Sequence, residues 1–154
     1  MLWRGFMPDF RVFELEERHF ALAYPLARSA AGVSLPRWQA YARQVTLQGG
    51  GVLGVESQDD CFYGLAAFRT QETLRHGPAL SVDVLAAIDL SSDRPVRSVL
   101  CTRLDEIARE RGLDSIILTL RPGRVSAGWN GCELAADTIG YLRSLAGPSA
   151  RPNR

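Results

Sequence analysis

Alternating apolar and polar side chains open the chain and predict a first β-strand. Residues 10–15 (FRVFEL) place aromatic and β-branched residues between charged ones, which is the period of a half-buried strand. Residues 17–31 then change to a spacing of three and four, so an amphipathic helix is expected there. Pro25 lies inside this pattern and should kink or divide the helix, because its ring removes one backbone donor.

A second helix and a β-hairpin follow. Ser34 is a favourable N-cap with Pro36 in the first turn, and the glycine run at 49–51 should end the helix. Its expected apolar face comprises Leu35, Trp38, Tyr41, Ala42 and Val45. Residues 51–57 and 61–70 have the composition of strands and are separated by the turn-like sequence SQDD. This part of the chain therefore predicts an antiparallel meander.

A strand–helix–strand unit is the strongest pattern in the chain. The long apolar run at 79–90 (ALSVDVLAAIDL) predicts a strand near the centre of the sheet. A helix should follow, with Asp93 as its N-cap and Gly112 at its C-terminal end. Its expected apolar stripe comprises Val96, Val99, Leu100, Leu104, Ile107 and Ala108. The apolar strand at 113–120 must then be parallel to the first, through a right-handed crossover. A last amphipathic helix is expected at 133–145.

Composition and charge describe one globular domain over residues 1–147, followed by a disordered tail at 148–154. The chain has 154 residues, of which 46% are hydrophobic and 23% charged, as is usual for globular proteins. All 18 basic residues are Arg, which is typical of GC-rich bacterial genomes, and the net charge of +1 argues against a nucleic-acid partner. No apolar run reaches membrane-spanning length and no signal peptide is recognisable, so a cytoplasmic protein without a membrane partner is expected.

Cysteine and histidine residues give little support for a metal or nucleophile site. Cys61, Cys101 and Cys132 form no CxxC pair, so neither a zinc site nor a disulfide framework is expected, and all three are interpreted as small core residues. His19 and His76 have no partner at motif spacing and are interpreted as packing or surface histidines. No metal is therefore predicted.

The order of these elements resembles the core of the GNAT acyltransferases. The most specific part of the resemblance is the sequence of residues 89–120 (DLSSDRPVRSVLCTRLDEIARERGLDSIILTL). The resemblance implies a mixed α/β sheet in three layers, with an antiparallel meander followed by a β–α–β crossover. It also implies that acetyl-CoA or another acyl-CoA is the co-substrate of an N-acetyltransferase. The acceptor would be an amine of a small molecule or a protein, and its identity is not readable from the sequence. The sequence leaves open whether the chain forms a homodimer.

The resemblance further implies where an acyl-CoA would bind. In the family, the strand matching 80–90 splays from its neighbour and its backbone binds the pantetheine arm, which here points to Leu85, Ala86 and Ala87. The loop after that strand binds the pyrophosphate at a helix N-terminus, which here points to Arg94, Val96, Arg97 and Ser98. The family's loop has an Arg or Gln followed by two spaced glycines, whereas the window DRPVRS has no glycine, and Pro95 removes one N–H donor. The arginine side chains can replace such donors with bidentate phosphate contacts.

Two further residues carry open interpretations. Asp83 interrupts the apolar strand, so it is either a base that deprotonates an amine acceptor or an outward-facing strand residue on the solvated side. Trp129 lies among glycines and is expected to pack under the last helix rather than to mark a partner surface.

The sequence leaves two functions open. One is an acyltransferase that works mainly by proximity, and the other is a GNAT-like binding or regulatory module without catalysis, which the glycine-free loop favours.

Overall fold

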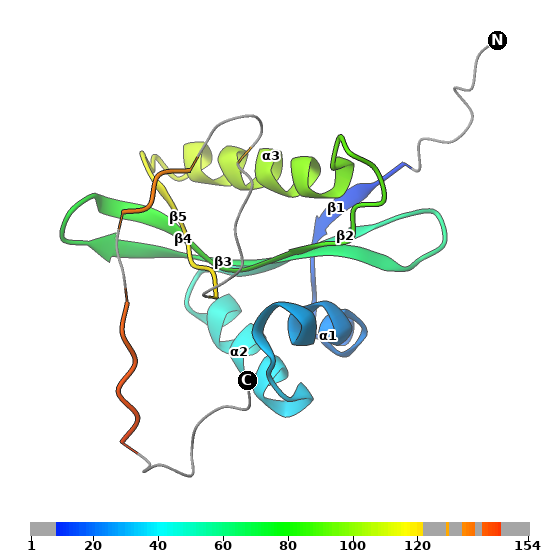
Figure 1. Ribbon diagram of the computed structural model, residues 1–154, viewed down its shortest axis with the longest axis horizontal. Helices are drawn as coiled ribbons and strands as arrows, with labels where there is room; N and C mark the ends of the chain where they lie inside the picture. The colour runs from blue at the N-terminus through cyan, green and yellow to red at the C-terminus, as the bar shows by residue number, and fades with distance from the viewer. Residues whose placement is uncertain (1–8, 122–128, 130–133, 138–139, 146–154) are drawn as a thin grey trace.

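The structure is a computed structural model that describes residues 9–121, 129, 134–137 and 140–145 (Figure 1). Within these residues the chain folds into five strands and three helices. In chain order they are β1 (Arg11–Glu14), α1 (Glu17–Ala31), α2 (Leu35–Leu47), β2 (Gly51–Glu56), β3 (Phe62–Thr73), β4 (Gly77–Ala87), α3 (Pro95–Glu110) and β5 (Ile116–Leu118). The predicted order of elements is confirmed up to β5.

The strands form one mixed sheet in the order β1-β2-β3-β4-β5. The first four are antiparallel neighbours and β5 is parallel to β4, so the predicted meander and crossover are both confirmed. The hairpin of β3 and β4 is longer than the sequence predicts. Its ladder reaches the pair Thr73↔Gly77, although residues 71–78 carry the polar and turn-forming composition of a loop.

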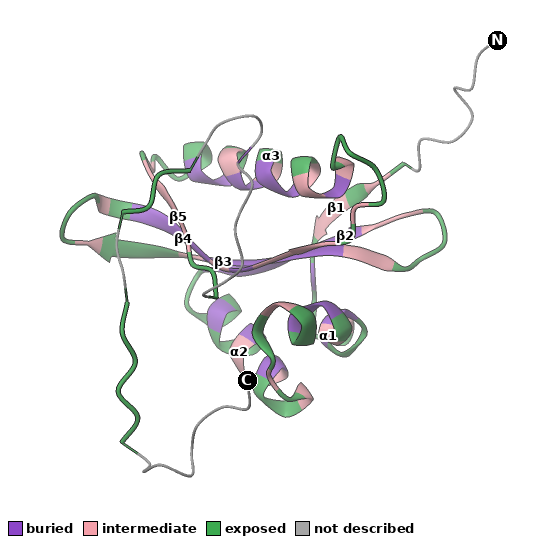
Figure 2. Cartoon of the chain, viewed as in Figure 1, coloured by how far each residue is buried: buried purple, intermediate pink, exposed green. Residues whose placement is uncertain are grey.

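The sheet lies between two helical layers. Helices α1 and α2 cover one face and α3 covers the other, and buried residues line the inner side of each helix (Figures 1 and 2). The face toward α3 buries Leu100, Leu104, Phe68, Leu80 and Val82. The opposite face buries Phe20, Trp38, Leu65 and Val84. Both apolar stripes that the helical spacing predicts therefore face the sheet, and the three-layer architecture is confirmed.

The first two helices begin as the sequence predicts, but Pro25 does not divide the first of them. Ser34 caps α2, since its hydroxyl oxygen accepts a hydrogen bond from the Arg37 N–H at 3.4 Å. Helix α1 continues through Pro25 from Glu17 to Ala31, so the prediction of a divided helix is wrong. Proline costs the helix one hydrogen bond, and burial of the α1 apolar face on the sheet offsets that loss.

The two ends of α3 differ in how well the sequence predicts them. Gly112 adopts a left-handed conformation with φ +68°, and the Leu113 N–H donates to the Ala108 carbonyl at 2.9 Å, so the predicted glycine terminus is confirmed. Asp93 is not the N-cap. Arg94 occupies that position with φ 48°, and its side chain makes no capping hydrogen bond. The carboxylate that bonds the first turn comes from Asp89 instead.

The described residues of the predicted C-terminal helix are not helical. Residues 134–137 and 140–145 have no helical assignment and are exposed, including apolar Tyr141, Leu142 and Leu145. An amphipathic helix of this length needs a surface to pack against, and the described residues offer this stripe none. Trp129 is buried as predicted, but it packs against α3, where its Nε1 donates to Asp105 at 2.8 Å, and not under a last helix. The predicted tail at 148–154 lies outside the described residues.

Candidate functional site

A β-bulge interrupts β4 in the middle of the sheet. Ala67 pairs with Val84 and Phe68 pairs with Val82, so Asp83 is the extra residue on β4. Because of the bulge, two successive side chains turn to the same face. Val84 packs in the cluster beside α1 and α2, and Asp83 reaches Tyr41 on α2. The carboxylate therefore lies on the helical α1/α2 side of the sheet.

The pairing of β4 with β5 ends where the bulge begins. The parallel register covers Leu80↔Ile116 to Val82↔Leu118, and the last bond of this ladder is donated by Thr119 N–H to the Val82 carbonyl at 3.0 Å. β4 itself continues to Ala87, and among the described residues no further strand pairs with it on that side. Beyond Val82 the described residues after β5 no longer pair with β4, which is compatible with the splayed strands that the sequence resemblance implies.

Backbone donors of β4 point into the region beyond this separation. The Ile88 N–H donates to the Tyr63 carbonyl of β3 at 2.7 Å. Since N–H groups alternate between the two sides of a strand, those of Leu85 and Ala87 point away from β3, toward the side that β5 leaves. Leu85, Ala86 and Ala87, the predicted pantetheine positions, are each half-buried on this part of β4. The strand thus presents backbone groups where an extended chain can pair with them.

The start of α3 is bonded entirely within the chain. Val96 N–H donates to Asp89 Oδ1 at 2.8 Å and Arg97 N–H donates to Asp89 Oδ2 at 3.1 Å. The Ser98 N–H bonds the Arg94 carbonyl at 3.0 Å, and the Arg94 N–H bonds the Ser91 carbonyl at 3.2 Å. The predicted phosphate positions are therefore brought together at one helix end. However, their amides already have acceptors, and the Val96 side chain is buried in the core.

Asp83 lies in a polar network on the other face of the sheet. Its Oδ2 accepts a hydrogen bond from Tyr41 Oη at 2.9 Å and forms an ion pair with Arg69 Nε at 3.0 Å. Its Oδ1 has a longer contact from Ser81 Oγ at 3.2 Å. The side chain of Asp83 is 22% exposed, so it is neither fully buried nor on an open surface. Sequence spacing gives no sign of Tyr41 or Arg69 as its partners, because both come from other elements.

The surroundings of Tyr41 raise the pKa of its phenol. Its burial raises the pKa of the phenol far above the usual value, and the neighbouring Asp83 charge raises it further, while Arg69 partly opposes the shift. The phenol therefore stays protonated and keeps donating to the carboxylate. Helix α2 holds the ring in place, because Tyr41 packs beside Trp38 with ring centroids 6.3 Å apart.

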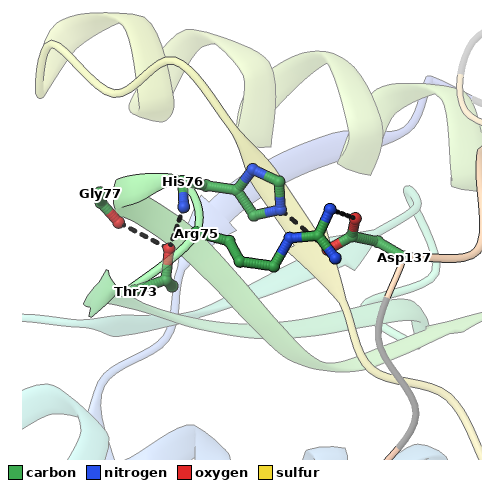
Figure 3. A network of polar contacts seen from close by, with 5 residues as sticks. All are labelled: Thr73, Arg75, His76, Gly77 and Asp137. Carbon is green, nitrogen blue, oxygen red and sulfur yellow. Dashed lines mark hydrogen bonds and ion pairs between the residues drawn. The ribbon is translucent and has the colours of Figure 1, made fainter.

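His76 has a partner that the sequence does not reveal. Its Nε2 lies 2.8 Å from Asp137 Oδ2, and Arg75 forms an ion pair with the same carboxylate at 3.4 Å (Figure 3). The Thr73 hydroxyl accepts a hydrogen bond from the His76 N–H and donates to the Gly77 carbonyl, which fixes the hairpin turn. Asp137 is distant in sequence, so no spacing pattern could have predicted this contact. The cluster connects Asp137 to the tip of the β3–β4 hairpin.

The remaining candidates from the sequence carry no chemistry in the described residues. Cys101 is buried in α3, and burial raises the pKa of its thiol to about 11, which agrees with an unreactive core residue. Cys61 is exposed, so its interpretation as a core residue is wrong; it lies beside the β2–β3 turn, where the chain leaves the sheet. His19 accepts a hydrogen bond from the Glu16 N–H at its Nδ1 and packs against Phe13.

Neither a metal cluster nor a membrane-spanning helix is found in the part of the chain that the structure describes. No group of three or more His, Cys, Asp or Glu side chains is arranged to hold a metal ion there. No helix there is both long enough and apolar enough to cross a membrane. Three polar features remain among the described residues: the Asp83 network, the start of α3, and the edge of β4 at residues 85–87, which no described strand pairs with on the β5 side and which we term the free edge of β4.

Comparison with known proteins places this architecture in one fold. No family profile and no curated protein matches the chain in sequence. Solved structures do match. The aminoglycoside N-acetyltransferase AAC(6')-Iy in complex with CoA is 12% identical with a TM-score of 0.71, over 93% of this chain and 99% of that one.

Two further solved structures, whose names give different acceptors, have the same fold. Ribosomal-protein-alanine N-acetyltransferase from Brucella melitensis biovar Abortus 2308 is 20% identical with a TM-score of 0.66, over 89% of this chain and 99% of that one. Glucosamine-6-phosphate N-acetyltransferase from Arabidopsis thaliana is 11% identical with a TM-score of 0.64, also over 89% and 99%. At these identities the likeness concerns the fold. The chain therefore has the fold of the GNAT acetyltransferases.

Proposed function

We propose that the chain is an acyl-CoA-dependent N-acyltransferase, in which the free edge of β4 binds the pantetheine arm of the donor. The observation that carries this proposal is the end of the β4–β5 ladder at Val82, while β4 continues to Ala87. The amide groups of Leu85 and Ala87 face that side, where they can pair with the amides of a pantetheine chain as another strand would. A solved structure of the same fold contains CoA.

The reaction would join an amine to the acyl carbon of the donor. Acyl-CoA supplies an activated thioester, so attack by the amine forms a C–N bond and breaks the C–S bond, with the thiolate leaving. Holding both reactants in one complex accounts for most of the acceleration. The strand amides next to the bulge can stabilise the negative charge that develops on the carbonyl oxygen. Because the attacking amine nitrogen becomes positively charged as the C–N bond forms, the chain must also accept one proton from it.

Asp83 is our proposed proton acceptor. Tyr41 and Arg69 both bond Oδ2, so they orient the carboxylate and leave Oδ1 with the single long contact from Ser81 among the described residues. Oδ1 is thus the atom proposed to take the proton. Its position at the bulge, directly before the strand edge that would bind pantetheine, supports this role, because the acyl group is carried at the end of that arm.

The phosphates of the donor need a separate account. The first amides of α3 are occupied by Asp89, so the side chains of Arg94 and Arg97 are the proposed phosphate ligands. The double change Arg94→Ala with Arg97→Ala should weaken CoA binding by about 2 to 4 kcal/mol, the loss expected for two charge-assisted contacts. Calorimetric titration with CoA and with pantetheine measures it, and pantetheine affinity should not change.

Transfer itself is tested by the release of free thiol from acetyl-CoA in the presence of a panel of amines. Asp83→Asn should slow transfer by about 100-fold while CoA affinity is kept. Transfer at the wild-type rate by this variant would remove Asp83 from the reaction. Equal CoA affinity in the wild type and the double arginine variant would remove the phosphate site.

A second candidate is favoured by one observation. Because the Asp89 carboxylate already occupies the helix end, the chain also fits a GNAT-like module that binds a partner or small molecule without catalysis. Thermal unfolding separates the two candidates, since a ligand that binds only the folded state raises the midpoint. A rise with millimolar acetyl-CoA supports the enzyme. No rise, together with no thiol release, favours the module.

A further inference from the structure

Asp89 stands between the end of β4 and the start of α3, and it completes the hydrogen bonding of that helix end. The first helical residue, Pro95, has no N–H. The next two amides, of Val96 and Arg97, donate to the two oxygens of Asp89, and the Ser98 amide bonds the carbonyl of the N-cap residue. The first turn thus has no amide left for an external anion, although an uncapped helix start would offer several.

The helix end cannot easily withdraw from this position. Val96 is fully buried on the sheet. A Cβ on Gly64 of β3 would lie 2.7 Å from Val96 Cγ1, so strand and helix are already in close contact. Asp89, in contrast, is half-buried in the exposed loop between β4 and α3. Of the two partners in this contact, the carboxylate is the one that can move.

A diphosphate and the Asp89 carboxylate need the same hydrogen-bond donors. Both are anions that accept from helix amides and gain from the helix dipole, so only one of them can occupy the first turn. A diphosphate bound beside an ionised Asp89 would also meet like-charge repulsion. A neutral pantetheine arm on the free edge of β4 meets neither obstacle, because its proposed contacts end before the loop.

We propose that Asp89 is a specificity-determining residue for the donor: its carboxylate competes with the diphosphate for the start of α3, so the chain discriminates against CoA relative to pantetheine-type thioesters. This inference rests on the proposed function, because it assigns the donor to the same strand and helix. Two independent observations carry it, the paired Asp89 contacts at 2.8 and 3.1 Å and the parting of β4 from β5 beside them.

The test compares three proteins by calorimetry: the wild type, Asp89→Asn and Asp93→Asn. Asp93 is an exposed carboxylate of the same loop, so its change removes the same charge without touching the helix amides. The probes are CoA, pantetheine and inorganic pyrophosphate. Asp89→Asn should bind CoA and pyrophosphate about tenfold more tightly, as expected for one charge-assisted contact, whereas Asp93→Asn should stay within about twofold of the wild type. All three should bind pantetheine equally.

Each other outcome overturns the inference. CoA affinity that is unchanged or weaker in Asp89→Asn means that Asp89 supports the site rather than competing for it. An equal gain in Asp93→Asn means that general loop charge, not competition, sets the affinity. If Asp89→Asn does not fold, Asp89→Ser keeps a neutral capping oxygen and replaces it in every comparison.

Thiol release tests the proposed function separately from the Asp89 competition. A gain in pyrophosphate affinity without thiol release by any of the three proteins supports the competition and refutes the acyltransferase. Thiol release by the wild type without a gain in Asp89→Asn refutes the competition alone. No binding of CoA, pantetheine or pyrophosphate by any of the three proteins overturns both proposals.

Discussion

The two ends of α3 satisfy their unpaired backbone hydrogen-bonding groups in different ways. At the C-terminal end the chain uses its own next residues: Gly112 takes a left-handed conformation and the Leu113 amide closes the last turn on Ala108. At the N-terminal end the first amides bond Asp89, which precedes the N-cap residue Arg94 by a whole loop. A local cap is fixed by the helix it ends, whereas a cap carried on a loop can be exchanged for another anion.

The largest effect is expected between these ends, where α3 contacts the sheet. Leu100 is fully buried in the α3 cluster, so Leu100→Asp places a charge in the core without a partner and should abolish cooperative unfolding. Thermal unfolding followed by circular dichroism measures this. Thr102→Asp, on the exposed side of the same helix, is the matched control and should keep the transition. A wild-type midpoint for Leu100→Asp would contradict the packing of α3.

The N-terminal end is expected to give the next effect. Asp89→Ala removes the acceptor of two helix amides and should lower the free energy of unfolding by about 1 to 2 kcal/mol. Asp93→Ala should change it by less than about 0.5 kcal/mol, because the structure gives Asp93 no capping contact. Urea denaturation of both variants decides between the two aspartates. A larger loss for Asp93→Ala would return the cap to the residue that the sequence favours.

The C-terminal end is expected to give the smallest effect. Gly112→Ala should cost about 1 kcal/mol, because alanine is strained at φ +68°. Nothing lies within 4 Å of a Cβ built at this position, so the cost is one of backbone conformation and not of collision. Gly112→Asn should cost less, since asparagine tolerates the left-handed region. Equal stability of Gly112→Ala and the wild type would show that this end frays.

The sequence predicts α3 well where the determinants are local. The apolar stripe from Val96 to Ala108 and the glycine that follows the helix are both readable, because each depends on residues within one or two turns. The Asp89 contact is not readable in the same way. An aspartate close before the helix is the usual signal of a cap, and Asp93 fits it better than Asp89; the loop conformation, set by tertiary contacts, decides otherwise.

The same distinction holds across the fold and the site. The strands, the crossover and the parting of β4 from β5 follow from hydrophobic patterning and from the family resemblance. The partners of Asp83 do not, since Tyr41 and Arg69 come from α2 and β3 and meet only once the sheet is covered. The C-terminal helix at 133–145 is the clearest failure. The segment has the amphipathic pattern of a helix, but such a helix is stable only when its apolar face packs against a surface.

Binding of the donor along the free edge of β4 is the central claim, and amide chemical shifts test it most directly. In a titration of the isotope-labelled protein with acetyl-CoA, the N–H resonances of Leu85 and Ala87 should move progressively to saturation, because these amides face the side that β5 leaves. The Val12 amide, on the distant edge strand β1, should not move. Saturable shifts confined to other elements, or no shifts at millimolar acetyl-CoA, would contradict the claim.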